Sequence, residues 1–153
     1  MKNFKIFIAC PISKYLTENG IDNEFEKFIR EIYAHCKTMC SNVFIALERE
    51  EFGKKKMYGE KCTVPDFIEM QDTDVLIAFP EDSMGVSVEI GWASVLKKEI
   101  VVFIDKKYKQ SELVKAINSI TPGKRIDIDS SNGYNSLIEN IKFEITNYLN
   151  NRN

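Results

Sequence analysis

Four short apolar runs constrain the fold of this chain more than any other feature. They cover residues 5–9, 43–47, 75–79 and 100–104. Each has the length of a strand buried on both faces, and polar or turn-forming residues close it. Between the first two runs, apolar residues recur at intervals of three and four over residues 25–39, which predicts an amphipathic helix. Buried strands that alternate with such helices indicate βαβ units and a parallel sheet.

The rest of the chain continues the same alternation. We expect a long charged loop over 48–61 that is a candidate binding loop, helices over 65–71, from 86 onward, over 111–119 and over 134–149, and a short edge strand over 125–128. These elements predict an α/β fold, a flavodoxin-like (Rossmann-like) sandwich with a mainly parallel sheet of four to five strands. We find no repeat or internal boundary, so residues 1–153 are expected to form a single domain.

Composition narrows the classes of function. The chain has 153 residues and a net charge of -2, so no basic field recruits a nucleic acid polymer. Its start does not have the pattern of a signal peptide, and no apolar run has the length of a membrane span, which together predict a cytoplasmic protein without a membrane partner. Four cysteines lack a CxxC pair and accompany the lone His35, which favours reduced core thiols over a metal site.

The segment after the third apolar run carries the clearest chemical pattern. Pro80 ends the predicted strand, and an apolar set at helical spacing begins at Val86. The first turn of a helix that follows a parallel strand presents free N–H groups and a positive dipole end, a natural anion site. Ser83, Gly85 and Ser87 are small or hydroxyl residues suited to such a site. A simple N-cap with a tight turn is the alternative explanation for them.

Glu89 lies about one turn inside this predicted helix. Its Cα–Cβ bond tilts back toward the helix N-terminus, which aims the carboxylate at the anion site. A carboxylate in that position is hard to explain as a contribution to stability, although a solvated glutamate in a first helical turn is common. The nearby N-terminus should favour the ionised form of the Glu89 carboxyl group.

Residues spaced around Glu89 form a longer motif. Asp66 is followed eight residues later by Asp74, which leads the third strand, and the motif Gly-x-x-x-Glu-x-Gly-x-Ala then covers residues 85–93. This pattern resembles the nucleoside 2-deoxyribosyltransferase superfamily, and the resemblance extends from the first strand to about Ile104. It implies a Rossmann-like fold and chemistry at an N-glycosidic bond.

The resemblance implies roles for both carboxylates. Glu89 would attack or stabilise C1′ of the sugar, as one carboxylate does in retaining glycosidases. Asp66 would bind the base or deliver a proton to it as a general acid. A structural charge near a helix start after Pro65 is the alternative for Asp66. Asp74, at a strand start, is expected to be structural.

Ser83 distinguishes two branches of this superfamily. In the transferases an Asp usually precedes the catalytic Glu by six residues and holds the free 5′-hydroxyl, whereas nucleoside 5′-monophosphate N-glycosidases have a Ser that helps to bind the phosphate. A hydroxyl and helix N–H groups can bind phosphate, whereas a carboxylate would repel it. The segments around Arg49, Asp66, Phe79 and Glu89 look closest to CMP-type hydrolases, which implies a pyrimidine nucleoside monophosphate as substrate.

The same resemblance suggests the remaining contacts. Ser13, with Cys10 and Ile12, occupies the place of the loop that touches sugar or phosphate. Arg49 and Phe52 would contact the base, Phe52 by stacking. An exposed charged loop explains Arg49 and Phe52 equally well. The resemblance also implies a homo-oligomer in which a neighbour completes the pocket, and it implies no metal and no cofactor.

Two other functions fit the same residues. A 2-deoxyribosyltransferase would exchange bases on deoxyribose and would be expected to carry Asp in place of Ser83. A catalytically idle nucleotide-binding or sensing module would not need both Glu89 and Asp66. The leading prediction is therefore an enzyme that hydrolyses a nucleoside 5′-monophosphate to a free base and a pentose 5-phosphate.

Overall fold

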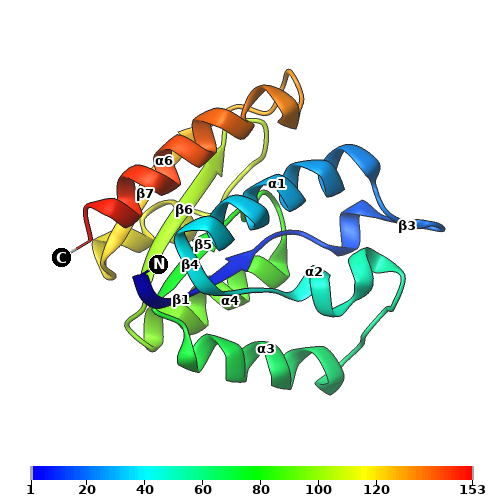
Figure 1. Cartoon of the computed structure of the whole chain (residues 1–153), viewed down its shortest axis with the longest axis horizontal. Helices are drawn as coiled ribbons and strands as arrows, with labels where there is room; N and C mark the ends of the chain where they lie inside the picture. The colour runs from blue at the N-terminus through cyan, green and yellow to red at the C-terminus, as the bar shows by residue number, and fades with distance from the viewer. Residues whose placement is uncertain (1, 153) are drawn as a thin grey trace.

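A five-stranded sheet forms the centre of the protein, whose computed structural model describes residues 2–152 (Figure 1). Its strands are β1 (Lys2–Ala9), β4 (Cys40–Ile45), β5 (Val75–Ala78), β6 (Glu99–Asp105) and β7 (Gly123–Ile128). They lie in the order β4-β1-β5-β6-β7, and every neighbouring pair is parallel. Counted along the chain, this is the order 2-1-3-4-5 of flavodoxin-like folds, so the predicted fold class is confirmed.

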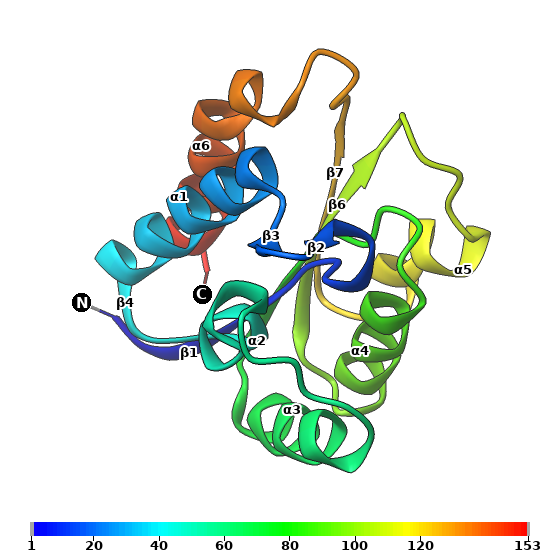
Figure 2. The ribbon, with the colours of Figure 1, turned by 90° about the vertical axis from the view of Figure 1, so that its right-hand side faces the viewer.

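Helices cover both faces of the sheet. They are α1 (Asn23–Met39), α2 (Ala46–Arg49), α3 (Glu60–Asp72), α4 (Met84–Val95), α5 (Glu112–Lys115) and α6 (Ile138–Asn150). Figure 2 shows α1 and α6 on one side of the sheet and α4 and α5 on the other. Met70 of α3 packs in the same apolar cluster as α4. Among the described residues, no helix has the length and apolar character needed to cross a membrane.

The central strands are apolar throughout because both of their faces are buried. In β1, Ile6 and Ile8 pack in the cluster that contains α1 and α6, whereas Phe7 packs in the cluster that contains α4. The same alternation continues in β5, where Val75 faces α1 and Leu76 faces α4. Successive side chains of a strand point to opposite faces of the sheet. Because helices cover both faces here, the strand sequence is a continuous apolar run.

Helix α1 shows how one sequence segment covers a sheet face. Asp22 caps its N-terminus by accepting a hydrogen bond from the Phe25 N–H at 3.1 Å. Its buried residues follow the predicted three-and-four spacing: Phe25, Phe28, Ile29, Ile32 and Cys36. These side chains form one stripe against the sheet.

Several elements differ from the sequence-based expectation. β4 begins at Cys40, and the last two residues of the predicted strand instead open α2, because buried apolar residues suit either element. α3 begins at Glu60, five residues before Pro65, and so contains a proline that cannot donate to the Lys61 carbonyl oxygen. The short antiparallel strands β2 (Leu16–Thr17) and β3 (Gly20–Ile21) were not expected, because two residues carry no readable period.

Candidate active site

A cavity of about 280 Å³ opens beyond the carboxyl ends of β1 and β5. These two strands are neighbours, but the chain places β4 on one side of β1 and β5 on the other. Ligands bind at such a switch point in open α/β sheets. Seven of the sequence-predicted site residues line the cavity: Cys10, Ile12, Ser13, Asp66, Ser83, Gly85 and Glu89.

Glu89 projects from α4 into this cavity and is partly buried. Loss of hydration, and after it the charge of Asp66, raise the pKa of the Glu89 carboxyl group to about 8, and Arg49 opposes this shift. The expectation that the helix N-terminus keeps Glu89 ionised is therefore wrong for the free protein at neutral pH. Burial outweighs the helix dipole because a low-dielectric pocket destabilises the charged carboxylate.

Asp66 reaches the cavity from α3 and pairs with Arg49. The Arg49 Nη1 donates to Asp66 Oδ1 at 2.7 Å, and the Asp66 side chain is only 14% exposed. Burial raises the pKa of Asp66, while the Arg49 guanidinium lowers it. Asp66 and Glu89 thus share one cavity, and the charge of Asp66 acts on the Glu89 carboxyl group. Such a pair favours a state that retains one proton.

The N-terminus of α4 forms another wall of the cavity. Ser83 is the N-cap, and its Oγ accepts a hydrogen bond from the Val86 N–H at 3.3 Å. The alternative explanation of Ser83 as a cap is therefore correct, but it is compatible with binding. A hydroxyl that accepts one bond keeps its proton for an anionic ligand, and the first N–H groups of the helix have no intrahelical partner.

A second cavity of about 350 Å³ adjoins the first. Ser13, Ser83 and Gly85 line both cavities, and Lys14, Asp82 and Met84 line only the second. These three shared residues lie between the second cavity and the carboxyl groups of Asp66 and Glu89. A ligand that spans both spaces would pass these hydroxyl and backbone groups.

Cys10 follows β1 directly and lines the first cavity. Burial, with a smaller contribution from Glu89, raises the pKa of its thiol well above the ordinary value. Cys10 is therefore a neutral thiol in the free protein, suited to contact with an uncharged part of a ligand and not to nucleophilic attack.

The structure does not bring three predicted site residues to the cavity surface. Arg49 lies behind Asp66 and holds it, so its role is to position that carboxyl group. Phe52 is buried in the core with the Arg30 guanidinium 3.3 Å from the centre of its ring. This placement argues against stacking on a bound base. Ser87 donates its hydroxyl proton to the Ser83 carbonyl oxygen at 3.0 Å and lines a different groove.

Known structures resemble this fold at low sequence identity. A CMP N-glycosidase of Clostridium botulinum, BcmB, superposes with a TM-score of 0.65 and 21% identity, covering 94% of this chain and 99% of BcmB. BlsM superposes with a TM-score of 0.69 and 22% identity, covering 93% of both chains. A conserved protein of Enterococcus faecalis V583 gives 0.59 and 16%, over 94% of this chain and 99% of that one.

These likenesses establish the fold alone, because their sequence identities are low. No protein-family model matches the chain, and no curated protein matches it at a significant level. The function must therefore be argued from the cavity itself.

Several residues that line the cavity were not singled out from the sequence, although most of them lie in the predicted binding loop 48–61. Glu50 is 7% exposed, and burial raises the pKa of its carboxyl group. Lys56, Met57, Tyr58 and Cys62 contribute from the loop and the start of α3. A usable indication existed for Glu50, since it follows the end of the second sheet strand, and parallel strands bring their carboxyl ends to one edge.

Within residues 2–152, no group of three or more His, Cys, Asp or Glu side chains is arranged to hold a metal ion. Four cysteines are free thiols: Cys10, Cys36, Cys40 and Cys62. The cavity brings the coupled carboxyl groups of Asp66 and Glu89, with Glu50 beside them, together with the hydroxyl and N–H donors at Ser13 and the start of α4. This arrangement suits acid–base and nucleophilic chemistry on an anionic ligand.

Proposed function

We propose that this protein hydrolyses the N-glycosidic bond of a nucleoside 5′-monophosphate, releasing the free base and a pentose 5-phosphate. The observation that carries the proposal is that Glu89 and Asp66 share one cavity with the N-terminus of α4. Two carboxyl groups whose environments differ can divide the roles of nucleophile and acid. The helix N-terminus supplies a phosphate site at the other end.

The cavities suggest how such a substrate lies. The phosphate would occupy the space between Ser13, Ser83 and Gly85, where both cavities meet. C1′ of the sugar would then face Glu89, and the base would lie toward Asp66. Binding of the phosphate holds the reacting carbon against the nucleophile, so remote binding energy contributes to the rate.

The chemistry balances with water as the only co-substrate. The proton that Glu89 carries in the free protein first passes to Asp66. The ionised Glu89 carboxylate then attacks C1′, the C1′–N bond breaks, and its electron pair leaves with the base. Asp66 donates its proton to that departing base. A water molecule then attacks C1′ of the glycosyl ester, releasing the Glu89 carboxylate, and one proton of the water restores Asp66. The sum is nucleotide plus water to base plus pentose 5-phosphate.

Ser83 supports the hydrolase branch, and the likeness to a known structure supports a pyrimidine substrate. Ser83 stands where the resembling transferases usually have Asp, and its hydroxyl faces the shared part of the cavities. The fold is similar to that of a protein named as a CMP N-glycosidase. We therefore propose CMP as the first substrate to test.

The direct test replaces the proposed nucleophile. Glu89→Gln keeps the size of the side chain but cannot form the glycosyl ester, so turnover of CMP should fall by several orders of magnitude. Chromatography should show cytosine and ribose 5-phosphate from the wild-type protein. Glu18, an exposed glutamate between β2 and β3, provides the control variant Glu18→Gln, which should retain full turnover. Near wild-type turnover by Glu89→Gln would remove Glu89 from the mechanism.

A further inference from the structure

Glu81 is a buried carboxylate that the proposed reaction does not use. It lies in the loop that joins β5 to α4, with 3% of its surface exposed and a φ of 45°. A residue other than glycine is strained in that left-handed region, and a buried carboxylate is unfavourable unless it is paired. The surrounding structure must therefore hold Glu81 in place.

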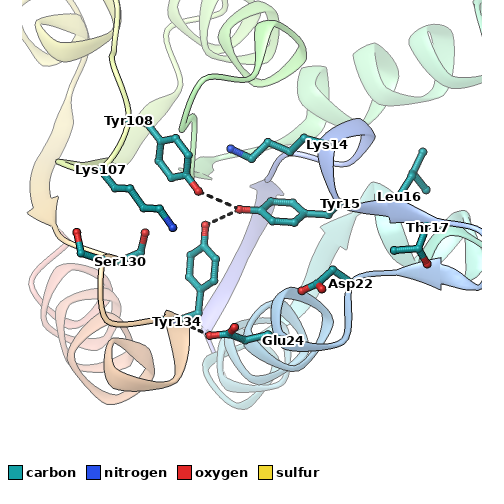
Figure 3. A pocket seen from close by; sticks show the side chains of 12 residues that line it. Lys14, Tyr15, Leu16, Thr17, Asp22, Glu24, Lys107, Tyr108, Ser130 and Tyr134 are labelled. Carbon is teal, nitrogen blue, oxygen red and sulfur yellow. Dashed lines mark hydrogen bonds between the residues drawn. The ribbon is translucent and has the colours of Figure 1, made fainter.

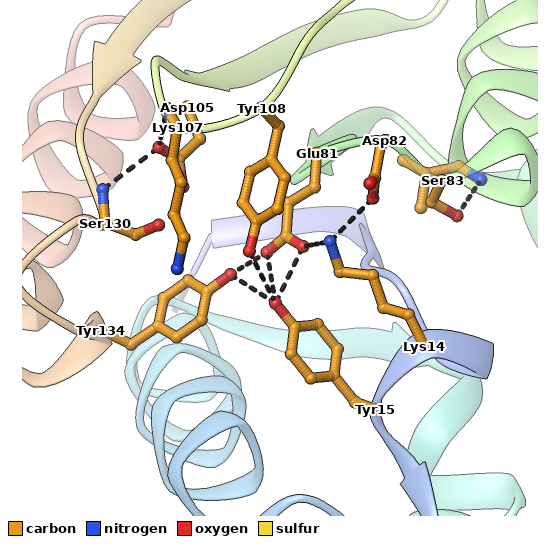
Figure 4. A network of polar contacts seen from close by, with 11 residues as sticks. Lys14, Tyr15, Glu81, Asp82, Ser83, Asp105, Lys107, Tyr108, Ser130 and Tyr134 are labelled. Atoms are coloured by element: carbon orange, nitrogen blue, oxygen red, sulfur yellow. Dashed lines mark hydrogen bonds and ion pairs between the residues drawn. The ribbon is translucent and has the colours of Figure 1, made fainter.

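Three side chains bind the Glu81 carboxylate, and together with it they form what we call the tyrosine–carboxylate network (Figure 4). The Tyr15 hydroxyl lies 2.9 Å from Oε2 and 3.1 Å from Oε1. Tyr134 donates to Oε1, and the Lys14 ammonium group pairs with Oε2. The partners come from the loop after β1 and from the turn before α6, far apart in the sequence.

Both tyrosine rings are themselves fixed on α1. Tyr15 stacks on Phe25 with ring centres 3.8 Å apart, and Tyr134 stacks on Phe28 at 4.6 Å. Their hydroxyl oxygens lie 2.7 Å apart, and Figure 3 shows the two side chains pointing toward one another. The network therefore ties the loop at Glu81 to a rigid helix.

The network lies directly beside the proposed phosphate site. Lys14 follows Ser13 in the chain, and its ammonium group also binds Asp82 Oδ1 at 2.7 Å. Asp82 precedes Ser83, the N-cap of α4. The loop after β1 thus supplies Ser13 and, next to it, Lys14 to the second cavity. The loop before α4 supplies Ser83 and, next to it, Asp82, which binds Lys14.

We propose that Glu81, Tyr15 and Tyr134 are positioning residues that set the spacing between Ser13 and the N-terminus of α4. The proposal rests on the proposed function, because that spacing matters for a ligand phosphate. None of the three is placed against C1′ or the base. Their loss should therefore weaken binding of the phosphate group and leave the chemical step nearly unchanged.

The test removes single hydroxyl groups. Tyr134→Phe and Tyr15→Phe keep the stacked rings but lose one hydrogen bond to the carboxylate. Each should raise the KM for CMP about tenfold, the usual effect of losing a hydrogen bond to a charged group, with kcat changed by less than about threefold. Amide hydrogen exchange in segments 10–16 and 79–86 should increase in both variants, because the two loops lose their anchor.

Tyr148→Phe is the matched control. The Tyr148 hydroxyl also donates to a carboxylate, Glu99 Oε2 at 2.7 Å, but Glu99 begins β6 at the opposite end of the sheet. This variant should lose a similar hydrogen bond without a change in KM or in exchange of the two loops. An equal rise of KM in the control, or an unchanged KM in both tyrosine variants, overturns the proposal.

The positioning role can still be tested if the proposed function is wrong. If the wild-type protein releases no base from any common nucleoside monophosphate, the hydrolase proposal is wrong, and exchange alone decides whether the network positions the two loops. Faster exchange in the two loops of Tyr134→Phe than of Tyr148→Phe then supports positioning. Equal exchange in these variants overturns it.

Discussion

At the scale of single residues, the protonation of two carboxyl groups decides the proposed chemistry. The pKa of Glu89 is raised to about 8 by burial and by Asp66, so below that pH the pair retains a proton. The reaction needs one proton on the pair, located on Asp66, with Glu89 ionised. Interacting groups titrate together, so the pH dependence reports the pair and not either residue alone.

We predict that kcat/KM for CMP falls as the pH rises above about 8, because the pair then loses its last proton. The second ionisation of a phosphate monoester lies at about pH 6, so the substrate does not produce this fall. Initial rates measured across this pH range test the prediction. A continued rise through that pH would mean that only ionisation of Glu89 matters and that Asp66 is not the acid.

The variant Asp66→Asn sharpens the same test. It should lower the rate by about 10²–10⁴-fold and should abolish the fall at high pH, because no acid remains to be lost. Asp66→Asn should lose far less activity on a nucleotide whose base can leave without being protonated. Asp72→Asn, an exposed carboxylate on the same helix, is the control. An equal loss for both kinds of substrate would assign Asp66 to positioning.

Glu89 should also make the stability of the protein depend on pH. The folded protein keeps the Glu89 proton between pH 4.5 and about 8, whereas the unfolded chain has lost it. The folded state then binds more protons, so the free energy of unfolding contributed by Glu89 falls as the pH rises through that window. Glu89→Gln has no proton to lose and should melt at a higher temperature than the wild type, with the difference largest near pH 8.

Thermal melting at both ends of this pH window measures the difference. Glu18→Gln, at an exposed position, should show no such trend. A melting difference that stays constant across the window would contradict the raised pKa of Glu89.

The sequence predicted which residues lie at the cavity better than it predicted their protonation. Ser83 and Glu89 could be placed at the cavity because the end of a strand and the start of a helix have local sequence patterns, whereas Asp66 was found from its spacing in the resembling motif. The raised pKa of Glu89 could not be predicted, since it depends on burial and on Asp66 from another helix. The resemblance suggested that Phe52 stacks on the base, but Arg30 of α1 covers its ring.

At the scale of elements, we expect the N-terminus of α4 to determine whether the site binds a substrate with a 5′-phosphate or one with a free 5′-hydroxyl. Ser83→Asp should preserve the helix, because Asp is also a good N-cap and is favourable at a positive dipole end. The new carboxylate would face the phosphate, so kcat/KM for CMP should fall strongly. Activity on cytidine should change far less.

Ser111 provides the matched control for this substitution. It caps α5 in the same way, with its Oγ accepting from the Leu113 N–H at 3.2 Å, and it does not line either cavity of the proposed site. Ser111→Asp should change kcat/KM for CMP and for cytidine by the same factor. Equal losses on CMP and cytidine in Ser83→Asp would refute the phosphate role of Ser83.

Elements with a full period were the most predictable from sequence. β5 and β6 coincide closely with their apolar runs, and α1 with its three-and-four pattern. The tyrosine–carboxylate network could not be predicted, because in the sequence Tyr134 is one of the apolar residues whose spacing predicts the last helix. Its contact with Glu81 depends on how the turn before α6 meets the loop after β5.

At the scale of the whole molecule, the expected homo-oligomer stays a prediction. Exposed apolar side chains gather on the layer of α3, α4 and α5: Val64, Phe67, Ile68, Met84, Val88, Val95 and Leu113. A groove of about 520 Å³ runs between α4 and α5. Such surfaces commonly mark contacts with other chains.

We predict a dimer or larger assembly by size-exclusion chromatography with light scattering. Val95 and Leu113 are each 83% exposed, and replacing both by Glu should shift the protein toward the monomer. Phe143→Glu, at a position 60% exposed on α6 in the opposite layer, is the control and should not change the mass. A wild-type monomer at all concentrations would contradict the expected oligomer.

The central claim is that the protein hydrolyses a nucleotide and does not transfer a nucleoside sugar. CMP, dCMP, cytidine and deoxycytidine should each be incubated with the wild-type protein, with and without adenine as an acceptor base, and all products separated by chromatography. We predict free cytosine from a monophosphate, much slower release from the matching nucleoside, and no adenine nucleoside or nucleotide. Preferred use of deoxycytidine, with formation of deoxyadenosine outpacing hydrolysis when adenine is present, would contradict this claim.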